Sequence, residues 1–345
     1  MRFGKGVVAR GLTLALIALA CAHCGSTKGA ASSGKSDSGV DPGAADAAGG
    51  GGSDDATASE GSMPDGGGGG GGGDATVVGP GNDHCLDATA IPLSGVNPRV
   101  DLMATTVGAT HDVDATCSTE QGPDIFYSFS VSKRVFVYAD TFGASWNTVL
   151  FLLSSTCEPI PTTTAGDAVC SDDSCGTPQS RVVALLEPGS YRLGLAGRGG
   201  AQGAATIHFE WALAGSGTIA QMPTSNAVRT GTTAGSGGNI DGISNACVAA
   251  AAEDSYWWAR CPSDPARTVN ASTCGGTTWE SVVEAQIPRL APHTPSAYRC
   301  NVDGCGLQAT LSMAIPAGAG LGVMSVDGQS GDDVGPYTMT VTYTP

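Results

Sequence analysis

The sequence predicts an all-β protein built from two tandem copies of one β-sandwich domain, and three observations support this. Landmark residues recur at a constant offset of 130 positions. Short apolar or alternating runs are separated by turn residues, with no helical periodicity between them. Only 14% of the residues are charged and 52 are glycine, which is typical of turn-rich β domains rather than helical ones.

The repeat is defined by pairs of matching residues. The pairs that share the offset of 130 are Cys117 and Cys247, Asp124 and Asp254, Cys170 and Cys300, and Cys175 and Cys305. Four landmarks in one register are hard to obtain by chance, so we infer two copies of one domain. We expect the copies to span residues 83–213 and 222–345, and each is long enough for a core of its own.

Each copy is expected to contain seven or eight short strands. In the first copy we expect strands at 89–93, 100–105, 125–131, 135–139, 148–153, 181–186, 191–196 and 205–212. In the second copy we expect them at 227–233, 255–259, 268–272, 281–287, 309–315, 321–326 and 337–343. Strands at this spacing are typical of a sandwich.

The N-terminus, residues 1–21, has the pattern of a lipoprotein signal peptide. Basic residues precede an apolar run at 12–20, which is too short to span a bilayer and fits the h-region of a secretory signal. Small residues lead into Cys21, as in the lipobox cut by the bacterial lipoprotein signal peptidase. We expect Cys21 to carry acyl chains that anchor the chain on a membrane, at the outer membrane or cell surface. The alternative is an ordinary secreted protein with an accidental cysteine.

Residues 22–82 are expected to form a disordered tether. The segment consists mostly of Gly, Ser, Ala and Asp, with an unbroken glycine run at 66–73 and hardly any apolar bulk to offset the entropy of ordering. Its expected reach is roughly 40 Å. The formal net charge of −16 leaves no basic patch for phosphates and argues against a nucleic-acid partner.

The order of motifs in the first copy resembles a known domain family. The motifs are Asn82-Asp-His-Cys85, Asp124-Ile-Phe-Tyr127, Trp146-Asn-Thr-Val149, the Asp-rich loop Ser171-Asp-Asp-Ser174 and Pro188-Gly-Ser-Tyr191. This order resembles the bacterial pre-peptidase C-terminal (PPC) domain, in the cysteine-bearing form found in tandem on myxobacterial lipoproteins. The resemblance implies a jelly-roll-like β-sandwich that is a non-catalytic accessory to secreted enzymes.

The two copies hold ten cysteines, which we expect to be mostly disulfide-bonded because the chain is exported. They are Cys85, Cys117, Cys157, Cys170, Cys175, Cys247, Cys261, Cys274, Cys300 and Cys305. Cysteines private to one copy favour Cys261–Cys274, and Cys85 paired with Cys157 or Cys117. The shared Cys-x4-Cys could also close its own loop, so the connectivity stays open. A zinc–thiolate site is disfavoured, since no histidine recurs beside these pairs.

Two sets of side chains are candidates for ligand contacts. Asp172 and Asp173, and Asp303 in the second copy, offer hard oxygen ligands for calcium, although such residues also form Asx turns. Trp146 and Trp279 hold equivalent places before a strand. Each is either a stacking platform for a sugar or protein partner, or a side chain that packs at the edge of the sandwich.

Catalytic signatures are missing from the sequence. It contains no nucleophile elbow, metalloprotease helix or phosphate loop, and its histidines have no counterparts between the copies. We therefore expect no enzyme and no cofactor besides the calcium considered above. The predicted function is a surface lipoprotein with binding, adhesion or spacer domains, whose partner is a polysaccharide or an extracellular protein. Duplication would raise avidity for a repetitive target. The alternatives are an accessory component of secreted hydrolysis, a purely structural envelope lipoprotein, or an enzyme with a single site.

Overall fold

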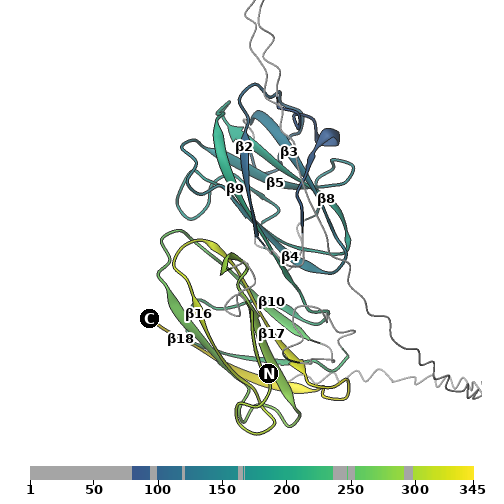
Figure 1. Cartoon of the computed structure of the whole chain (residues 1–345), viewed down its shortest axis with the longest axis vertical. Helices are drawn as coiled ribbons and strands as arrows, with labels where there is room; N and C mark the ends of the chain where they lie inside the picture. Colours follow the sequence, from purple (N-terminus) through teal and green to yellow (C-terminus); the bar gives the residue numbers. More distant parts are fainter. Residues whose placement is uncertain are drawn as a thin grey trace, which may run out of the picture. The chain divides into compact units, whose positions relative to one another are not determined.

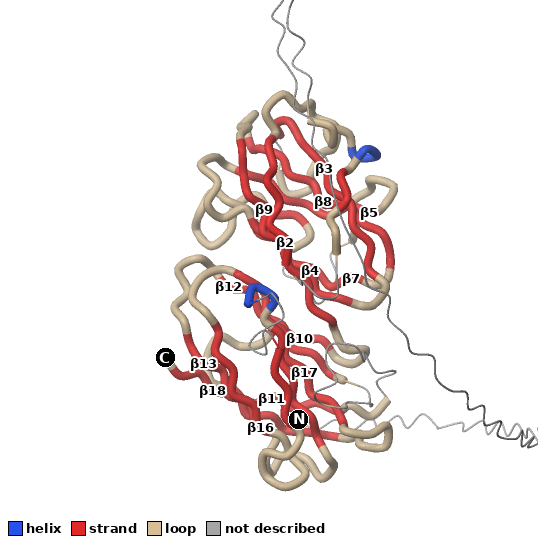
Figure 2. The backbone as a smooth tube through the Cα atoms, viewed as in Figure 1, coloured by secondary structure: helices blue, strands red, loops and turns tan. Residues whose placement is uncertain are grey.

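The computed structural model describes residues 80–93, 99–118, 121–161, 166, 168–235, 247, 253–290 and 298–345. These residues are almost entirely strand and loop, with two single-turn 3-10 helices, η1 (Cys85–Asp87) and η2 (Pro288–Leu290) (Figure 2). The predicted all-β class is confirmed. Among the described residues no helix is long and apolar enough to cross a membrane. The predicted signal peptide, Cys21 and nearly all of the tether lie outside the described residues.

The first sandwich consists of two sheets (Figure 1). The five-stranded sheet has the order β1 (Thr89–Ala90), β3 (Gln121–Val131), β8 (Gly189–Arg198), β5 (Thr148–Ser154) and β6 (Cys170–Ser171). The four-stranded sheet has the order β2 (Arg99–Thr105), β9 (Ala204–Leu213), β4 (Val135–Asp140) and β7 (Arg181–Leu186). All neighbours are antiparallel except β1 and β3, which are parallel.

The second sandwich repeats this topology. Its five-stranded sheet has the order β10 (Ile219–Gln221), β12 (Asp254–Arg260), β17 (Gly320–Gly328), β14 (Ser281–Gln286) and β15 (Tyr298–Asn301). Its four-stranded sheet has the order β11 (Ala227–Thr232), β18 (Pro336–Thr344), β13 (Arg267–Ser272) and β16 (Thr310–Ile315). Again only the first pair, β10 and β12, is parallel. The repeated topology agrees with the duplication inferred from the sequence.

Each sandwich has its own apolar core between its two sheets, because alternate residues of a strand point to one face. In β3 the inward residues are Ile125, Tyr127 and Phe129, and in β9 Ile207 and Phe209 meet them from the other sheet. A second, separate core lies between the sheets of the second sandwich. Complete burial of one such side chain stabilises the fold by roughly 1.5–3 kcal/mol.

The long strands were predicted well and the short ones were not. Every expected strand is present, with ends that differ by a few residues at most. The strands that the sequence did not reveal are β6, β10 and β15, which are short and carry no apolar alternation. Each sandwich therefore has nine described strands rather than seven or eight.

The predicted offset of 130 between the copies is wrong for β3 and its equivalent in the second sandwich, β12. Tyr127 pairs with Leu193 in β8, and Tyr256 pairs with Met324 in β17; all four side chains lie in the cores. Tyr127 is therefore equivalent to Tyr256, an offset of one residue less.

The backbone bonds of the same strands lead to the same register. The amide of Phe126 donates to Asn82 and the amide of Ser255 donates to Thr218, each in the segment before the sandwich. Asp124 thus corresponds to Glu253 and not, as predicted, to Asp254. A slip of one residue moves a side chain to the other face of its sheet, so this difference decides which residues are compared.

All ten described cysteines are disulfide-bonded, as predicted. The bonds are Cys85–Cys157, Cys117–Cys170, Cys175–Cys261, Cys247–Cys300 and Cys274–Cys305. Of the two partners considered for Cys85, Cys157 is the right one. The expected Cys261–Cys274 bond is wrong, and neither Cys-x4-Cys closes its own loop. Cys261 instead pairs across the repeat boundary, which reasoning within a single copy cannot foresee.

The two sandwiches lie within one compact unit and are joined by three kinds of contact. One is the Cys175–Cys261 disulfide. Another is a buried apolar cluster, the inter-sandwich cluster, formed by Phe136, Tyr138, Val183, Leu185, Ala212 and Ala214 of the first sandwich with Trp257, Leu321 and Val323 of the second. The third is hydrogen bonding, in which the amide of Leu321 donates to Oε2 of Glu210 at 2.8 Å and the amide of Leu213 donates to Oε1 of Gln286 at 3.2 Å. The tandem is thus covalently and non-covalently fixed.

Candidate functional site

The two predicted tryptophans occupy equivalent positions in the structure. The indole Nε1 of Trp146 donates to the carbonyl of Ala204 at 2.9 Å, and that of Trp279 donates to Pro336 at 3.1 Å. Each bond reaches the first residue of the last strand of its sandwich. Trp279 is only 8% exposed, whereas Trp146 is half-buried. Their indole N–H groups are thereby engaged within the fold.

The predicted calcium ligands lie on two separate loops. Asp172 and Asp173 both face Arg198, whose Nη1 is 2.9 Å from Oδ2 of Asp172 and 3.6 Å from Oδ2 of Asp173. Burial raises the pKa of Asp172 more than Arg198 lowers it. Asp303 is exposed in the second sandwich, where its neighbour Asn301 accepts a hydrogen bond from the amide of Thr310. A cation on the first loop would have to compete with the guanidinium of Arg198.

The outer face of the first five-stranded sheet carries a groove of about 590 Å³, which we call the Arg192 groove. It is lined by Ala90, Ile91, Pro92, Leu93, Ser128, Phe129, Ser130, Ser155, Ser190 and Arg192. Ser128 lies opposite Arg192, and Ser130 lies opposite Ser190, across the β3–β8 pair. The face therefore presents hydroxyl groups around one cation. Its size is within the range of ligand pockets.

The same positions of the second sandwich have the opposite character. Ser128 corresponds to Trp257, because Ile91 and Met222 donate their amides to the carbonyls of these two residues. Trp257 lies opposite Val323, so Val323 takes the place of Arg192. Both residues are buried in the inter-sandwich cluster. This part of the face thus serves as a protein contact in the second sandwich, whereas in the first no other described sandwich covers it.

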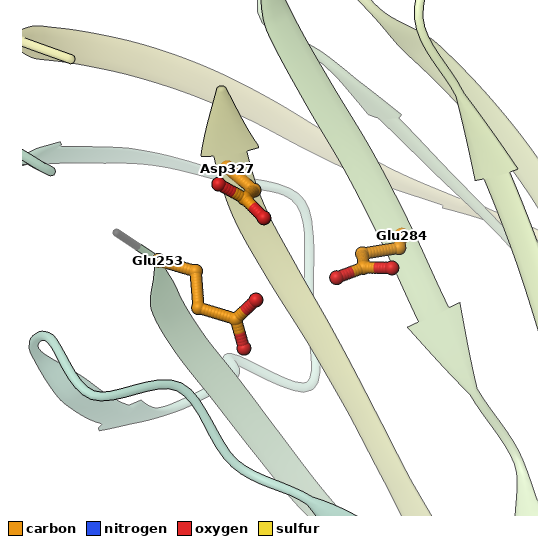
Figure 3. Close-up of side chains that lie close together, drawn as sticks. All are labelled: Glu253, Glu284 and Asp327. Atoms are coloured by element: carbon orange, nitrogen blue, oxygen red, sulfur yellow. The ribbon is translucent and has the colours of Figure 1, made fainter. Parts of the chain in front are cut away.

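A second cluster on the outer face of the second five-stranded sheet consists of Glu253, Glu284 and Asp327 (Figure 3). All three are buried, and one carboxylate oxygen of each lies within 4.8 Å of the others. The hydroxyl of Tyr298 donates to Glu284, and the amide of Gly328 donates to Asp327. Carboxylate oxygens are the ligands of Ca²⁺, so these residues could hold a divalent cation.

This carboxylate cluster was missed by the sequence reasoning. Glu253 directly precedes β12, Glu284 lies in β14 and Asp327 lies in β17, so these residues are far apart along the chain and no local motif joins them. The register of the strands places Asp124, Phe151 and Ala196 at the corresponding positions of the first sandwich. There the face is largely apolar. Only the acid, Asp124 in the first sandwich and Glu253 in the second, is common to both copies.

Asp124 acts as a structural acceptor in the first sandwich. It is fully buried and accepts hydrogen bonds from the amides of Asp112 at 3.1 Å and Val113 at 3.0 Å. Burial raises the pKa of Asp124 to about 6, although these two bonds and His111, 3.4 Å away, lower it. A hydrogen bond to Asp112 raises the pKa of the exposed His84 nearby. The cluster ties the loop before β3 to the sheet.

Comparison with known proteins adds little to this geometry. No protein-family model and no curated protein matches the chain. One similar solved chain belongs to the atomic structure of Sulfolobus Turreted Icosahedral Virus, with 14% sequence identity and a TM-score of 0.22. The similarity covers 64% of this chain and 56% of that chain, so this chain spans little more than half of the viral chain's length. A likeness this weak carries no functional argument.

Proposed function

We propose that the chain is a surface-displayed, non-catalytic binding lipoprotein, and that its first sandwich contacts the ligand. The observation that supports this is the Arg192 groove, an open, hydroxyl-lined hollow at the place where the second sandwich is buried against its neighbour. Five disulfides are typical of an oxidising, extracellular environment. Lipidation of Cys21 and the tether of residues 22–82 would hold the pair of sandwiches at the outer membrane.

The two copies have different roles in this proposal. The face that is open in the first sandwich is used by the second to bind the first, so the tandem offers this face once. The second sandwich then acts as a fixed support rather than as an equal binding domain. Gain of affinity through two equivalent sites, which duplication alone would predict, is not expected for this face.

The test is a binding screen of the full chain, with disulfides intact, on arrays of glycans and matrix proteins, in calcium and in chelator. We expect saturable binding to at least one array member and no turnover of peptide or glycan substrates. Turnover without binding would favour the alternative, an accessory or direct role in secreted hydrolysis. Neither binding nor turnover would favour a purely structural envelope lipoprotein.

Membrane attachment is tested separately by mass spectrometry of the mature protein. The expected N-terminus is an acylated Cys21, and Cys21→Ser should release the chain from the membrane fraction. A free Cys21 thiol in the mature protein, or cleavage elsewhere, would contradict lipid anchoring while leaving the binding proposal open.

A further inference from the structure

The side chains of the Arg192 groove indicate which class of ligand it accepts. We propose that the groove binds a carboxylated saccharide, with Arg192 pairing the carboxylate and Ser130 and Ser190 bonding the sugar hydroxyls. This inference rests on the function proposed above and names the ligand class of the same groove.

The charge of the groove differs from that of the whole chain. The chain has 32 acidic and 16 basic residues, yet Arg192 is the only charged residue among the ten that line the groove. An anion meets no lining carboxylate there. A guanidinium donates charge-assisted hydrogen bonds to a carboxylate, which makes arginine well suited to a uronic acid.

Arg192 is held in place by the protein itself. Its Nε donates to the carbonyl of Cys85 and its Nη1 donates to the carbonyl of Tyr191, each at 3.3 Å. Cys85 is in turn fixed by its disulfide to Cys157. Within the part of the chain that the structure describes, Nη2 has no protein partner. The guanidinium is therefore oriented before a ligand arrives, which lowers the entropy cost of binding.

The serines provide hydroxyls that suit a sugar. Oγ of Ser130 and Oγ of Ser190 are 2.8 Å apart, in a cross-strand pair on the exposed face. A hydroxyl donates one hydrogen bond and accepts two, so this pair keeps acceptor and donor capacity after bonding to itself. Beside the serines lie the exposed Pro92 and the half-buried Leu93, which are apolar. A saccharide presents hydroxyls at its edge and C–H groups on its face, and it matches both surfaces.

The comparison with the second sandwich shows which side chains occupy this face where it is a protein contact. The equivalent positions there hold Trp257, Leu321 and Val323, which fill the face with apolar bulk. The first sandwich has small serines at this face, and these leave a hollow beside an oriented cation.

The experiment is isothermal titration of the full, oxidised chain with trigalacturonic acid and with its methyl ester. The ester keeps the sugar and removes the charge. We expect the acid to bind at least about tenfold more tightly, since a charged hydrogen bond is lost in the ester. Arg192→Gln should remove this preference. Arg299→Gln, an equal change of charge at an exposed position of the second sandwich, should retain it.

A second variant tests whether the ligand occupies the Arg192 groove, without changing the charge of the groove. Ser130 is exposed, so Ser130→Trp should fold, keep the melting temperature of the wild type and block the groove. We expect at least about tenfold weaker binding of the acid. This variant keeps the test decisive if Arg192→Gln should prove unstable.

Five outcomes would overturn the inference. Equal binding of acid and ester, or an acid preference that survives Arg192→Gln and Ser130→Trp, would remove the groove as the site while leaving another binding surface open. Equal binding of dextran sulfate would reduce the interaction to charge alone. Binding of peptides with a free C-terminal carboxylate, but of no saccharide, would assign a different ligand class. Failure on every array would end both this inference and the proposed function.

Discussion

The outer faces of the two five-stranded sheets differ more than any other equivalent surfaces of the two sandwiches. At the same strand positions the first has Ser128, Ser190 and Arg192, whereas the second has Trp257, Leu321 and Val323. The apolar set packs against the four-stranded sheet of the first sandwich. The difference shows that duplication of a fold does not preserve the character of its surfaces, because one copy of the face is used to hold the tandem together.

The outer faces of the four-stranded sheets also differ, and here the apolar face belongs to the first sandwich. The outer residues Phe136, Tyr138 and Leu185 of the first are buried under the second sandwich. In the second sandwich the outward positions of β18 are Thr338, Thr340 and Thr342. These positions are polar, whereas the outer residues of the first four-stranded sheet form the apolar contact with the second sandwich.

The largest expected effect on stability comes from a substitution that makes the outer face of the second five-stranded sheet resemble that of the first. Trp257 is 3% exposed, and its ring centroid lies 6.0 Å from that of Phe136. We expect Trp257→Ser to lower the free energy of unfolding by about 3–5 kcal/mol, because a large cavity opens and a hydroxyl is buried. Denaturant titration followed by circular dichroism measures this. Ser128→Ala at the equivalent, half-buried position should change stability by only about 0.5 kcal/mol. Similar losses for both variants would contradict the difference between the faces.

Removal of the disulfide between the sandwiches should have the next largest effect on stability. Cys175 and Cys261 are 86 residues apart, so the bond restricts the unfolded chain over a long loop. Replacing both cysteines by serine should lower stability by about 2–4 kcal/mol. Hydrogen exchange should show the increase in opening at the inter-sandwich cluster. A matched control is the pair Cys85 and Cys157, whose removal should loosen the first sandwich and leave that cluster protected.

Glu210 makes the contact between the sandwiches sensitive to pH. It is 1% exposed, and burial raises its pKa to about 7 despite Arg99, whose Nη1 is 3.3 Å from Oε1. Between pH 4.5, the ordinary value, and about 7 the folded state keeps a proton that the unfolded state has lost. Stability from this group therefore falls as pH rises through that window, by on the order of 1–3 kcal/mol.

Glu210→Gln should flatten the pH dependence of the free energy of unfolding between pH 4.5 and about 7. The glutamine can still accept from Leu321, so we expect little change at pH 5 and a gain in the free energy of unfolding at pH 8. Asp124, with a pKa of about 6, contributes a slope of the same sign, so Asp124→Asn serves as the reference within one sandwich. A profile for Glu210→Gln that runs parallel to the wild type from pH 5 to 8 would contradict the assignment.

The sequence predicted the class of fold and most strands because apolar alternation is a local signal. It also predicted the duplication, because cysteines and tryptophans mark equivalent positions. It did not predict how β3 aligns with β12, the equivalent strand of the second sandwich. Asp254 follows directly after Glu253, so either acid can be aligned with Asp124. Only the ladder partners Leu193 and Met324 decide between them.

The candidate sites depended on contacts that no local pattern contains. Arg192 and Ser128 become neighbours only when β3 and β8 pair. The bond between Cys175 and Cys261 joins the two copies, so pairing rules applied within each copy led to the wrong partner for Cys261. Trp146 and Trp279 were correctly placed as equivalents, but their bonds to the last strands could not be derived from their spacing.

Those tryptophans give the smallest expected effect and a test of equivalence. Replacing either indole by phenylalanine removes the hydrogen bond to Ala204 or Pro336 and leaves a carbonyl without its donor. We expect each variant to lose about 1 kcal/mol, with the larger loss at Trp279, because its surroundings exclude water more completely. Saccharide binding should stay unchanged in both, since neither residue lines the Arg192 groove. A tenfold or greater loss of binding in Trp146→Phe, with stability intact, would instead identify this ring as a ligand platform and move the binding surface away from the groove.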